Sequence, residues 1–202
     1  MDLSAAFDLV RSGIFVRKAL RVIPDEGTVE LMHEFITNRK AFVELEDQSS
    51  FVFDLRAGTP QGSTLGPKIF NIYCNDLHEH VDGHLISYAD DSYVVVCADS
   101  LKELTEKAVN TMTRHLEWLR NNGMVCNVEK TELMIMNSDS PTSIVVMNRE
   151  ITSQTSMKVL GIQFDSKMCW NDQVSNVIKK QIGAYMDSGK SGAIWMQDRQ
   201  NW

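Results

Sequence analysis

Two adjacent carboxylates, Asp90 and Asp91, lie between two short runs of strand-forming residues, Leu85 with Ile86 before them and residues 93–96 after them. Because β-branched and aromatic residues favour strands and a short polar segment between strands favours a turn, this pattern predicts a β-hairpin with both acids at its tip. An Asp-Asp tip is by itself most often a solvated turn, since aspartate hydrogen-bonds its own backbone there. A metal site is the alternative, and other segments of the chain decide between the two.

Two further segments precede the hairpin. A third acid, Asp2, opens the sequence D-L-S-A-A-F-D at residues 2–8, and residues 58–67 read G-T-P-Q-G-S-T-L-G-P. Glycines and prolines predict a loop, which leads into an apolar helical pattern at Leu65, Ile69, Ile72, Tyr73 and Leu77. Such a loop lets a ligand approach the backbone closely, although an ordinary turn before a helix would have the same composition.

Taken together and in this order, the three segments resemble the motifs of the reverse transcriptase palm. Two further elements follow in the family's order: G-M-V-C-N-V-E-K-T at residues 123–131 is similar to its fourth motif, and V-L-G-I at residues 159–162 is similar to the hairpin that grips the primer. The resemblance covers about residues 2–175 and is specific, because five ordered motifs rarely coincide by chance. It points to non-long-terminal-repeat (LINE/jockey-like) retrotransposons. Group II intron maturases and telomerases are weaker relatives.

The resemblance implies that Asp2, Asp90 and Asp91 bind two Mg²⁺ ions, with Mn²⁺ as a possible substitute. Two ions about 3.5–4 Å apart stabilise the attacking and leaving oxygens when a primer hydroxyl attacks a nucleotide triphosphate. Mg²⁺ prefers oxygen ligands and uses one or two protein carboxylates with water and phosphates, so a few aspartates suffice. The implied activity is RNA-directed DNA synthesis, and the implied partners are an RNA template, a DNA primer and deoxynucleoside triphosphates.

Other residues receive roles only through the resemblance. Phe7 would exclude a ribose 2′-hydroxyl, with core packing as its alternative role. Lys130 would act as general acid toward the pyrophosphate leaving group, or supply positive charge near it, whereas a lysine considered alone is usually a solvated surface residue. The implied substrate-binding residues are Phe7, Gly58, Pro60, Gln61, Gly62 and Tyr88.

The implied fold is α+β, a polymerase palm with a ferredoxin-like antiparallel sheet backed by helices. We expect the palm over residues 1–175 and the start of a thumb-like helix and an irregular tail over 176–202. The fingers, most of the thumb and the endonuclease of a longer polyprotein are expected outside this sequence. Local patterns predict a loop and a helix over 7–23 and helices at 26–39 and 101–122. Ser100 and Glu103 form a capping box at the start of the last helix, whose apolar stripe consists of Leu101, Leu104, Ala108, Met112, Leu116 and Leu119. Strands are predicted at 41–45, 51–55, 132–136, 144–147 and 158–164, and turns at 47–50 and 148–150.

The net charge of the chain does not favour binding of nucleic acid. The chain has 202 residues, of which 43% are hydrophobic and 23% charged, so it can form a core, but its net charge is −7 and its isoelectric point about 5.2. Proteins that bind nucleic acid usually carry clustered Lys and Arg, and a small basic group at residues 11–21 reads as a solvated face. The alternative function is therefore a catalytically inactive retroelement remnant that binds nucleic acid or protein.

Cysteines and apolar segments complete the expectations. The four cysteines form no C-x-x-C pair and lack histidines at zinc spacing, so they read as reduced and mostly buried thiols. Neither a signal segment nor an apolar run of about 18 residues occurs, which predicts no membrane partner and an intracellular location, nucleus or cytoplasm.

Overall fold

The computed structural model describes residues 2–3, 5–46, 48–138 and 140–187, with no account of the side chains of residues 2, 3, 128 and 184–187. It combines helices with small, mostly antiparallel sheets, as expected for an α+β chain. Contacts divide the chain into two compact units, residues 1–131 with 143–151 and residues 132–142 with 152–202. The boundary at residue 175 between the palm and the start of a thumb-like helix stays a prediction.

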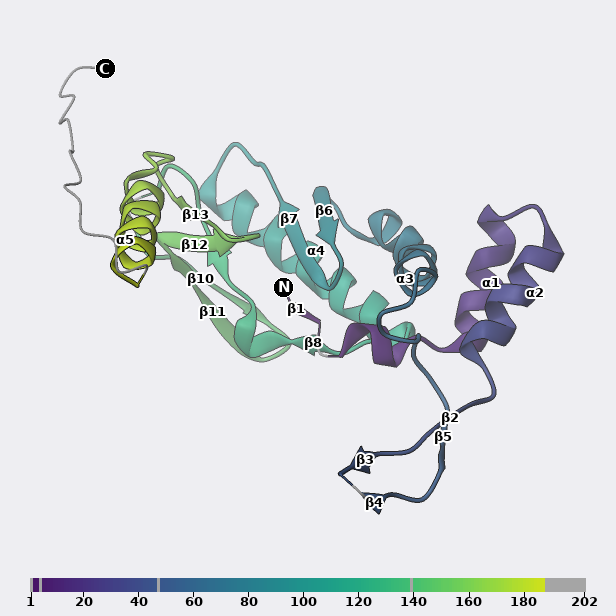
Figure 1. Cartoon of the computed structure of the whole chain (residues 1–202). Helices are drawn as coiled ribbons and strands as arrows, with labels where there is room; N and C mark the ends of the chain where they lie inside the picture. The colour runs from purple at the N-terminus through teal and green to yellow at the C-terminus, as the bar shows by residue number, and fades with distance from the viewer. Residues whose placement is uncertain (1, 4, 47, 139, 188–202) are drawn as a thin grey trace. The chain divides into compact units, whose positions relative to one another are not determined.

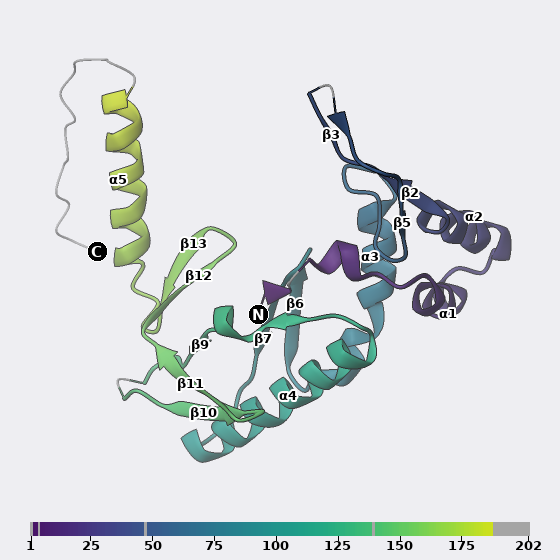
Figure 2. The same cartoon turned by 90° about the horizontal axis from the view of Figure 1, so that it is seen from below.

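The described part of the first unit contains four α-helices: α1 (Ser12–Val22), α2 (Glu26–Ile36), α3 (Gly66–Cys74) and α4 (Leu101–Asn121). Short 3₁₀ turns η1 (Ala6–Leu9) and η2 (Asn75–His80) precede α1 and follow α3. Helix α1 packs against α2 and α3, and α4 packs against η2 (Figures 1 and 2). The Ser100 hydroxyl accepts the Glu103 amide at 3.2 Å, which caps α4 as expected, and Gly123 ends the helix at a φ of 69°.

Helix α4 supplies much of the core of this unit. Met112, Leu116 and Leu119 are buried as the apolar stripe predicts, but Leu101 at the start of the stripe is 46% exposed. The stripe missed three other buried side chains of α4, those of Thr111, His115 and Trp118. Helix α2 ends at Ile36, three residues before the predicted end, and its Leu31 is 64% exposed.

Lys18 corrects the expectation of a solvated basic face on α1. Its ammonium donates to the Asp76 carboxylate at 2.6 Å and to the Tyr73 carbonyl at 2.7 Å, and it lies 4.3 Å from the centre of the Trp118 ring. Burial lowers the pKa of Lys18, which the Asp76 carboxylate partly offsets. Trp118 donates its indole N–H to the same carboxylate oxygen at 3.1 Å. A charged pair therefore joins α1, η2 and α4.

The central sheet of this unit has the strand order β6-β7-β1-β8. Strands β6 (His84–Tyr88) and β7 (Asp91–Val95) form the predicted hairpin, and β1 (Asp2–Leu3) lies between β7 and β8 (Cys126–Asn127) (Figure 1). All three pairings are antiparallel. Strand β8 and the 3₁₀ turn η3 (Val128–Lys130) after it were not expected from local patterns.

A second hairpin extends from the helices α1 to α3 (Figures 1 and 2). Strand β2 (Arg39–Ala41) pairs with β5 (Phe53–Leu55), and β3 (Glu44–Leu45) pairs with β4 (Gln48–Ser49) closer to the tip. The predicted turn at 47–50 was therefore wrong in its bounds, because Gln48 and Ser49 pair in β4. Large apolar side chains on this hairpin are exposed, among them Phe42 and Phe51.

The unit also includes β10 (Ser143–Val146) and the first half of β11 (Arg149–Gln154), joined by a turn at Met147 and Asn148. The predicted turn at 148–150 was thus displaced, because residues 149 and 150 already belong to β11. Strand β10 packs against α4.

The second unit contains β9 (Leu133–Met134), which pairs in parallel with Ser153 and Gln154 of β11. Its hairpin of β12 (Ser156–Val159) and β13 (Ile162–Asp165) replaces the single strand predicted at 158–164. The turn of this hairpin lies at Leu160 and Gly161, both with positive φ, as the resemblance of residues 159–162 to a hairpin implies. Helix α5 (Asn171–Asp187) follows, and the expected irregular tail from residue 188 lies outside the described residues.

The four cysteines carry reduced thiols. Cys74 and Cys126 are half-buried, whereas Cys97 and Cys169 are exposed, so the expectation of mostly buried thiols was wrong for two of them. Burial raises the pKa of the Cys74 thiol to about 12, which makes this group unreactive at neutral pH. No helix in the described part of the chain is long and apolar enough to cross a membrane.

Candidate active site at the centre of the sheet

Two of the three predicted acids occupy directly opposed positions in the central sheet. Asp2 on β1 pairs with Asp91 on β7, and opposed Cα atoms in antiparallel strands lie about 4.5–5.5 Å apart. On the outer sides, Asp91 pairs with Tyr88 and Asp2 pairs with Asn127. Tyr88, Asp91, Asp2 and Asn127 therefore form one row across all four strands. We call these four positions the central row.

Asp90 lies beside this row, at the turn between β6 and β7. The turn consists of Ala89 and Asp90, and Ala89 has a φ of 53°, a left-handed conformation typical of two-residue hairpin turns. Asp90 and Asp91 are both half-buried. Asp91 accepts a hydrogen bond from the Tyr93 hydroxyl at 3.3 Å, and no partner of the Asp90 carboxylate is found among the described residues.

The carboxylates of Asp90 and Asp91 supply oxygen ligands of the kind that a hard cation prefers. Both residues are half-exposed, and few hydrogen bonds from the protein occupy their oxygens. Among side chains that the structure describes, no group of three or more His, Cys, Asp or Glu is arranged to hold a metal ion. The side chain of Asp2 lies outside that set. The three-acid metal site stays a prediction.

The glycine-rich loop is attached to the segment that follows Asp2. The Gly58 amide donates to the Val10 carbonyl at 2.8 Å, and the Thr59 amide donates to the Phe7 carbonyl at 2.9 Å. Gly58 has a φ of 91°, and a Cβ at this position would lie 2.9 Å from the Cα of Asp8. Only glycine allows the two segments to approach this closely.

The Gln61 side chain is held by Asp8, an acid for which the sequence motifs predicted no role. Its side-chain amide donates to the Asp8 carboxylate at 3.1 Å. Asp8 belongs to the first motif, 53 residues before Gln61, and nothing in the spacing indicates this long-range contact. The contact fixes the direction of the Gln61 amide.

Arg39 is a second residue that sequence reasoning missed. Its guanidinium donates to the carbonyls of Ala57 at 2.8 Å and Gly58 at 2.7 Å. The loop is therefore anchored at its start from β2 as well as from η1. An isolated arginine before a strand carries no sequence signal for this role.

The other predicted substrate-binding residues have definite positions. The Pro60 carbonyl accepts the Ser63 hydroxyl at 2.6 Å, which closes the loop before α3, and Gly62 has a φ of 76° with open space around it. Tyr88 is 66% exposed in the central row. Lys130 is exposed in η3, directly after the strand whose Asn127 pairs with Asp2.

Phe7 is half-buried, and its ring stacks on that of Phe70 with centroids 4.5 Å apart. Phe70 is fully enclosed in α3. This contact supports the packing role, and it also holds the Phe7 ring rigidly, which a steric filter would require. The two roles are compatible.

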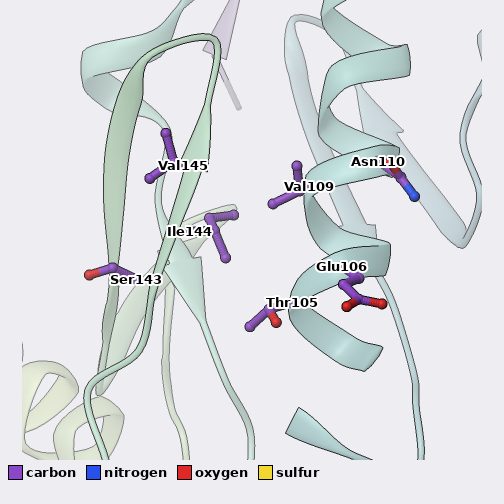
Figure 3. A pocket seen from close by; sticks show the side chains of 7 residues that line it. All are labelled: Thr105, Glu106, Val109, Asn110, Ser143, Ile144 and Val145. Atoms are coloured by element: carbon purple, nitrogen blue, oxygen red, sulfur yellow. The ribbon is translucent and has the colours of Figure 1, made fainter. Parts of the chain in front are cut away.

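A groove of about 450 Å³ lies between α4 and β10 of the same unit. Thr105 and Val109 of α4 project toward Ile144 of β10 (Figure 3). None of the predicted site residues lines this groove, and Glu106 is the one ionisable residue in its described lining.

Comparison with known proteins adds to this geometry. The family model described as "Reverse transcriptase (RNA-dependent DNA polymerase)" matches residues 1–164. The chain belongs to the reverse transcriptase family. The match includes the central row, the glycine-rich loop and the hairpin of β12 and β13 up to Phe164.

Its relatives are mobile-element proteins, as the resemblance to jockey-like elements predicted. The chain is 26% identical over 187 residues to the RNA-directed DNA polymerase from mobile element jockey of Drosophila melanogaster, which covers 88% of this chain and 20% of the relative. It is 28% identical over 138 residues to a Pol polyprotein from the type-1 retrotransposable element R1 of Nasonia vitripennis, covering 63% of this chain and 41% of the relative. The chain thus spans about a fifth to two fifths of these two proteins.

Proposed function

We propose that this chain forms the palm of an RNA-directed DNA polymerase of a retroelement. The palm would comprise residues 1–175 with a ferredoxin-like sheet, and residues 176–202 would begin a thumb-like helix. Its substrates would be deoxynucleoside triphosphates, copied from an RNA template onto a DNA primer. The observation that carries the proposal is the central row, since it pairs Asp2 of the first family motif with Asp91 of the third.

Asp2, Asp90 and Asp91 would hold the Mg²⁺ ions. The bound cations would lower the energy of the charge that develops on the attacking and leaving oxygens. The chain itself contributes position: the antiparallel pairing fixes β1 against β7, and the turn at Ala89 fixes Asp90 next to both. The Tyr93 hydroxyl orients one oxygen of Asp91 and leaves the other available.

The glycine-rich loop would bind the incoming nucleotide and the template. Asp8 accepts one N–H of Gln61, so the Gln61 amide presents its remaining donor and its carbonyl in a fixed direction. Gly58, Pro60 and Gly62 shape the backbone around it. Phe7 would exclude a ribose 2′-hydroxyl, and Lys130 would donate a proton or positive charge to the leaving pyrophosphate.

A Mn²⁺ titration followed by electron paramagnetic resonance tests the metal site on the 202-residue chain. We expect Asp90→Asn to weaken Mn²⁺ binding at least tenfold, because it removes one charged ligand. Asp99→Asn, an exposed acid between β7 and α4, is the matched control and should leave the affinity within twofold. Equal affinities of Asp90→Asn and the unaltered chain would refute the site.

The alternative function is a non-catalytic module that binds nucleic acid or protein, and the net charge of −7 favours its lack of catalysis. Positioning supplies much of the rate in phosphoryl transfer, and an acidic chain captures a primer–template poorly. We therefore expect little or no primer extension by this chain alone with Mg²⁺. Robust extension that Asp90→Asn abolishes would instead show that these residues suffice for catalysis and would exclude the alternative.

A further inference from the structure

Strands β1 and β8 share very little backbone pairing. Each has two residues, and the pairing consists of Asp2 with Asn127 and Leu3 with Cys126. Because even a longer two-stranded hairpin is only marginally stable in water, a pairing of this length needs support from contacts outside the sheet. The pairing also carries half of the central row, so whatever supports it sets the positions of Asp2 and Asn127.

The Tyr73 hydroxyl lies between the segment that follows β1 and the segment that precedes β8. It donates to the Asn122 carbonyl at 2.6 Å, in a buried hydrogen bond that spans 49 positions of the sequence. The Arg11 amide donates to the same hydroxyl. Asn122 ends α4 ahead of β8, and Arg11 begins α1 after β1 and η1. One hydroxyl therefore bridges both segments.

The Tyr73 side chain is itself held firmly. It is fully buried at the end of α3, and burial raises the pKa of its hydroxyl, which therefore stays protonated and able to donate. The Lys18 ammonium donates to the Tyr73 carbonyl at 2.7 Å and lies 5.2 Å from the centre of the Tyr73 ring. The hydroxyl thus connects the two strand segments to the helical core.

Arg11 makes a second contact between the same two segments. A Cβ on Gly123 would lie 2.6 Å from the Cζ of Arg11, so the guanidinium fills the space that the missing side chain leaves. Gly123 follows Asn122 and has a φ of 69°, the left-handed conformation that ends α4. The start of α1 and the end of α4 are therefore joined by side-chain packing as well as by the Tyr73 hydroxyl.

We infer that Tyr73 is a positioning residue for the central row: its hydroxyl holds β8 against β1 and thereby keeps Asp2 opposite Asp91 and Asn127. The sequence pattern placed Tyr73 only in the apolar stripe of α3. Tyr73 acts through the two segments that it bridges and is not itself a metal ligand. The inference rests on the proposed function, because the central row is the proposed metal site, but the link between the strands can be measured without a metal.

Amide hydrogen exchange of the 202-residue chain in EDTA tests the link. Tyr73→Phe removes the hydroxyl and keeps the ring. Because exchange reports local opening, we expect the amides of Leu3, Cys126 and Asn127 to exchange at least tenfold faster. The paired amides of β6 and β7 should change less than threefold.

Thr111→Val is the matched control, since it also removes one buried hydroxyl of this unit. The Thr111 hydroxyl donates to the Asp82 carbonyl at 2.8 Å and joins α4 to the segment before β6. The control should accelerate exchange of the β1 and β8 amides less than threefold. Equal acceleration of these amides in the two variants would indicate a general loss of stability and would overturn the inference.

A second pair of variants tests the same joint if Tyr73→Phe does not fold. Arg11→Ala removes the guanidinium that packs on Gly123 and should accelerate exchange of Cys126 and Asn127 at least threefold. Arg114→Ala, at an exposed arginine of α4, should leave both rates unchanged. Equal rates in the two arginine variants would contradict the inference.

Mn²⁺ affinity is a readout that a merely structural role would not change. Tyr73→Phe should weaken Mn²⁺ binding about fivefold, and Thr111→Val should leave the affinity within twofold. An unchanged affinity of Tyr73→Phe beside a tenfold loss in Asp90→Asn would overturn the inference. If Asp90→Asn has no effect on Mn²⁺ binding, the metal site fails, and exchange in EDTA still decides whether Tyr73 links the strands.

Discussion

Asp76 and Asp90 are both aspartates of the first unit, but their surroundings differ completely. The Asp76 carboxylate receives the Lys18 ammonium and the Trp118 indole, which joins three helical segments. The Asp90 carboxylate has no partner among the described residues and lies at a hairpin turn. The Asp76 carboxylate is paired inside the fold, whereas the Asp90 carboxylate is the one that the proposed function assigns to a metal ion. The helical core and the central row can therefore be separated experimentally.

The largest difference should appear in stability. Asp76→Ala leaves Lys18 half-buried without its counter-ion, and removal of one partner of a buried pair costs about 3 kcal/mol or more. Asp90→Ala should change the free energy of unfolding by less than about 0.5 kcal/mol, as surface substitutions usually do. Urea denaturation measures both. Similar losses in the two variants would erase the distinction between paired and available acids.

His115 in α4 gives the helical core a pH dependence. It is fully buried, its ring nitrogens have no partner within the described structure, and burial lowers its pKa to about 4. In the unfolded chain the His115 imidazole takes up a proton below about pH 6.5, whereas in the folded chain it stays neutral at that pH because its pKa is lowered. The free energy of unfolding is therefore unaffected by His115 protonation above about pH 6.5. It falls by up to about 3 kcal/mol as the pH drops toward about 4.

Urea denaturation of His115→Leu at neutral pH and at a pH just above the lowered pKa checks this expectation. On acidification the free energy of unfolding should fall less for the variant than for the unaltered chain. The difference between the two should be most of the expected loss of about 3 kcal/mol. His84→Gln, on the exposed side of β6, is the control and should behave like the unaltered chain. An identical pH dependence of all three proteins would show that His115 is not the acid-sensitive group.

A smaller contrast separates two glycines of the loop. At Gly58 an added Cβ would lie 2.9 Å from the Asp8 backbone, and the φ of 91° would also be unfavourable for alanine. At Gly62 the φ of 76° is unfavourable, but an added Cβ would have open space around it. We expect Gly58→Ala to cost about 2 kcal/mol and Gly62→Ala about 1 kcal/mol. Thermal unfolding measures the order. A larger loss at Gly62 would mean that the loop is not held against Asp8.

Local patterns predicted the elements whose signals are local. The acid hairpin and the capped α4 followed from alternation and a capping serine, and the pairing of strands near 41–45 and 51–55 followed from the polar segment between them, although the bounds of its turn were wrong. The split of residues 158–164 into β12 and β13 did not, because Leu160 adopts a positive φ that its residue type disfavours. The burial of Lys18 was missed because its partner Asp76 is 58 residues away.

The candidate site was predicted through ordered motifs, and the motifs of Asp2 and Asp91 meet in one sheet. What sequence could not supply is the register that opposes these two acids, since β1 contributes only two residues to the sheet. The supports of the loop, Asp8 and Arg39, were missed for a related reason: each acts through long-range contacts that follow no spacing rule.

Paramagnetic broadening of amide resonances by Mn²⁺ tests the central claim most directly, that the central row and its turn hold a divalent cation. We predict selective broadening at Leu3, Ala89 to Ser92 and Asn127, with the resonances of β2 and β5 unchanged. Asp90→Asn with Asp91→Asn should abolish this pattern, whereas Asp99→Asn should preserve it. Broadening confined to other acids, or absent from both Leu3 and the turn, would contradict the claim.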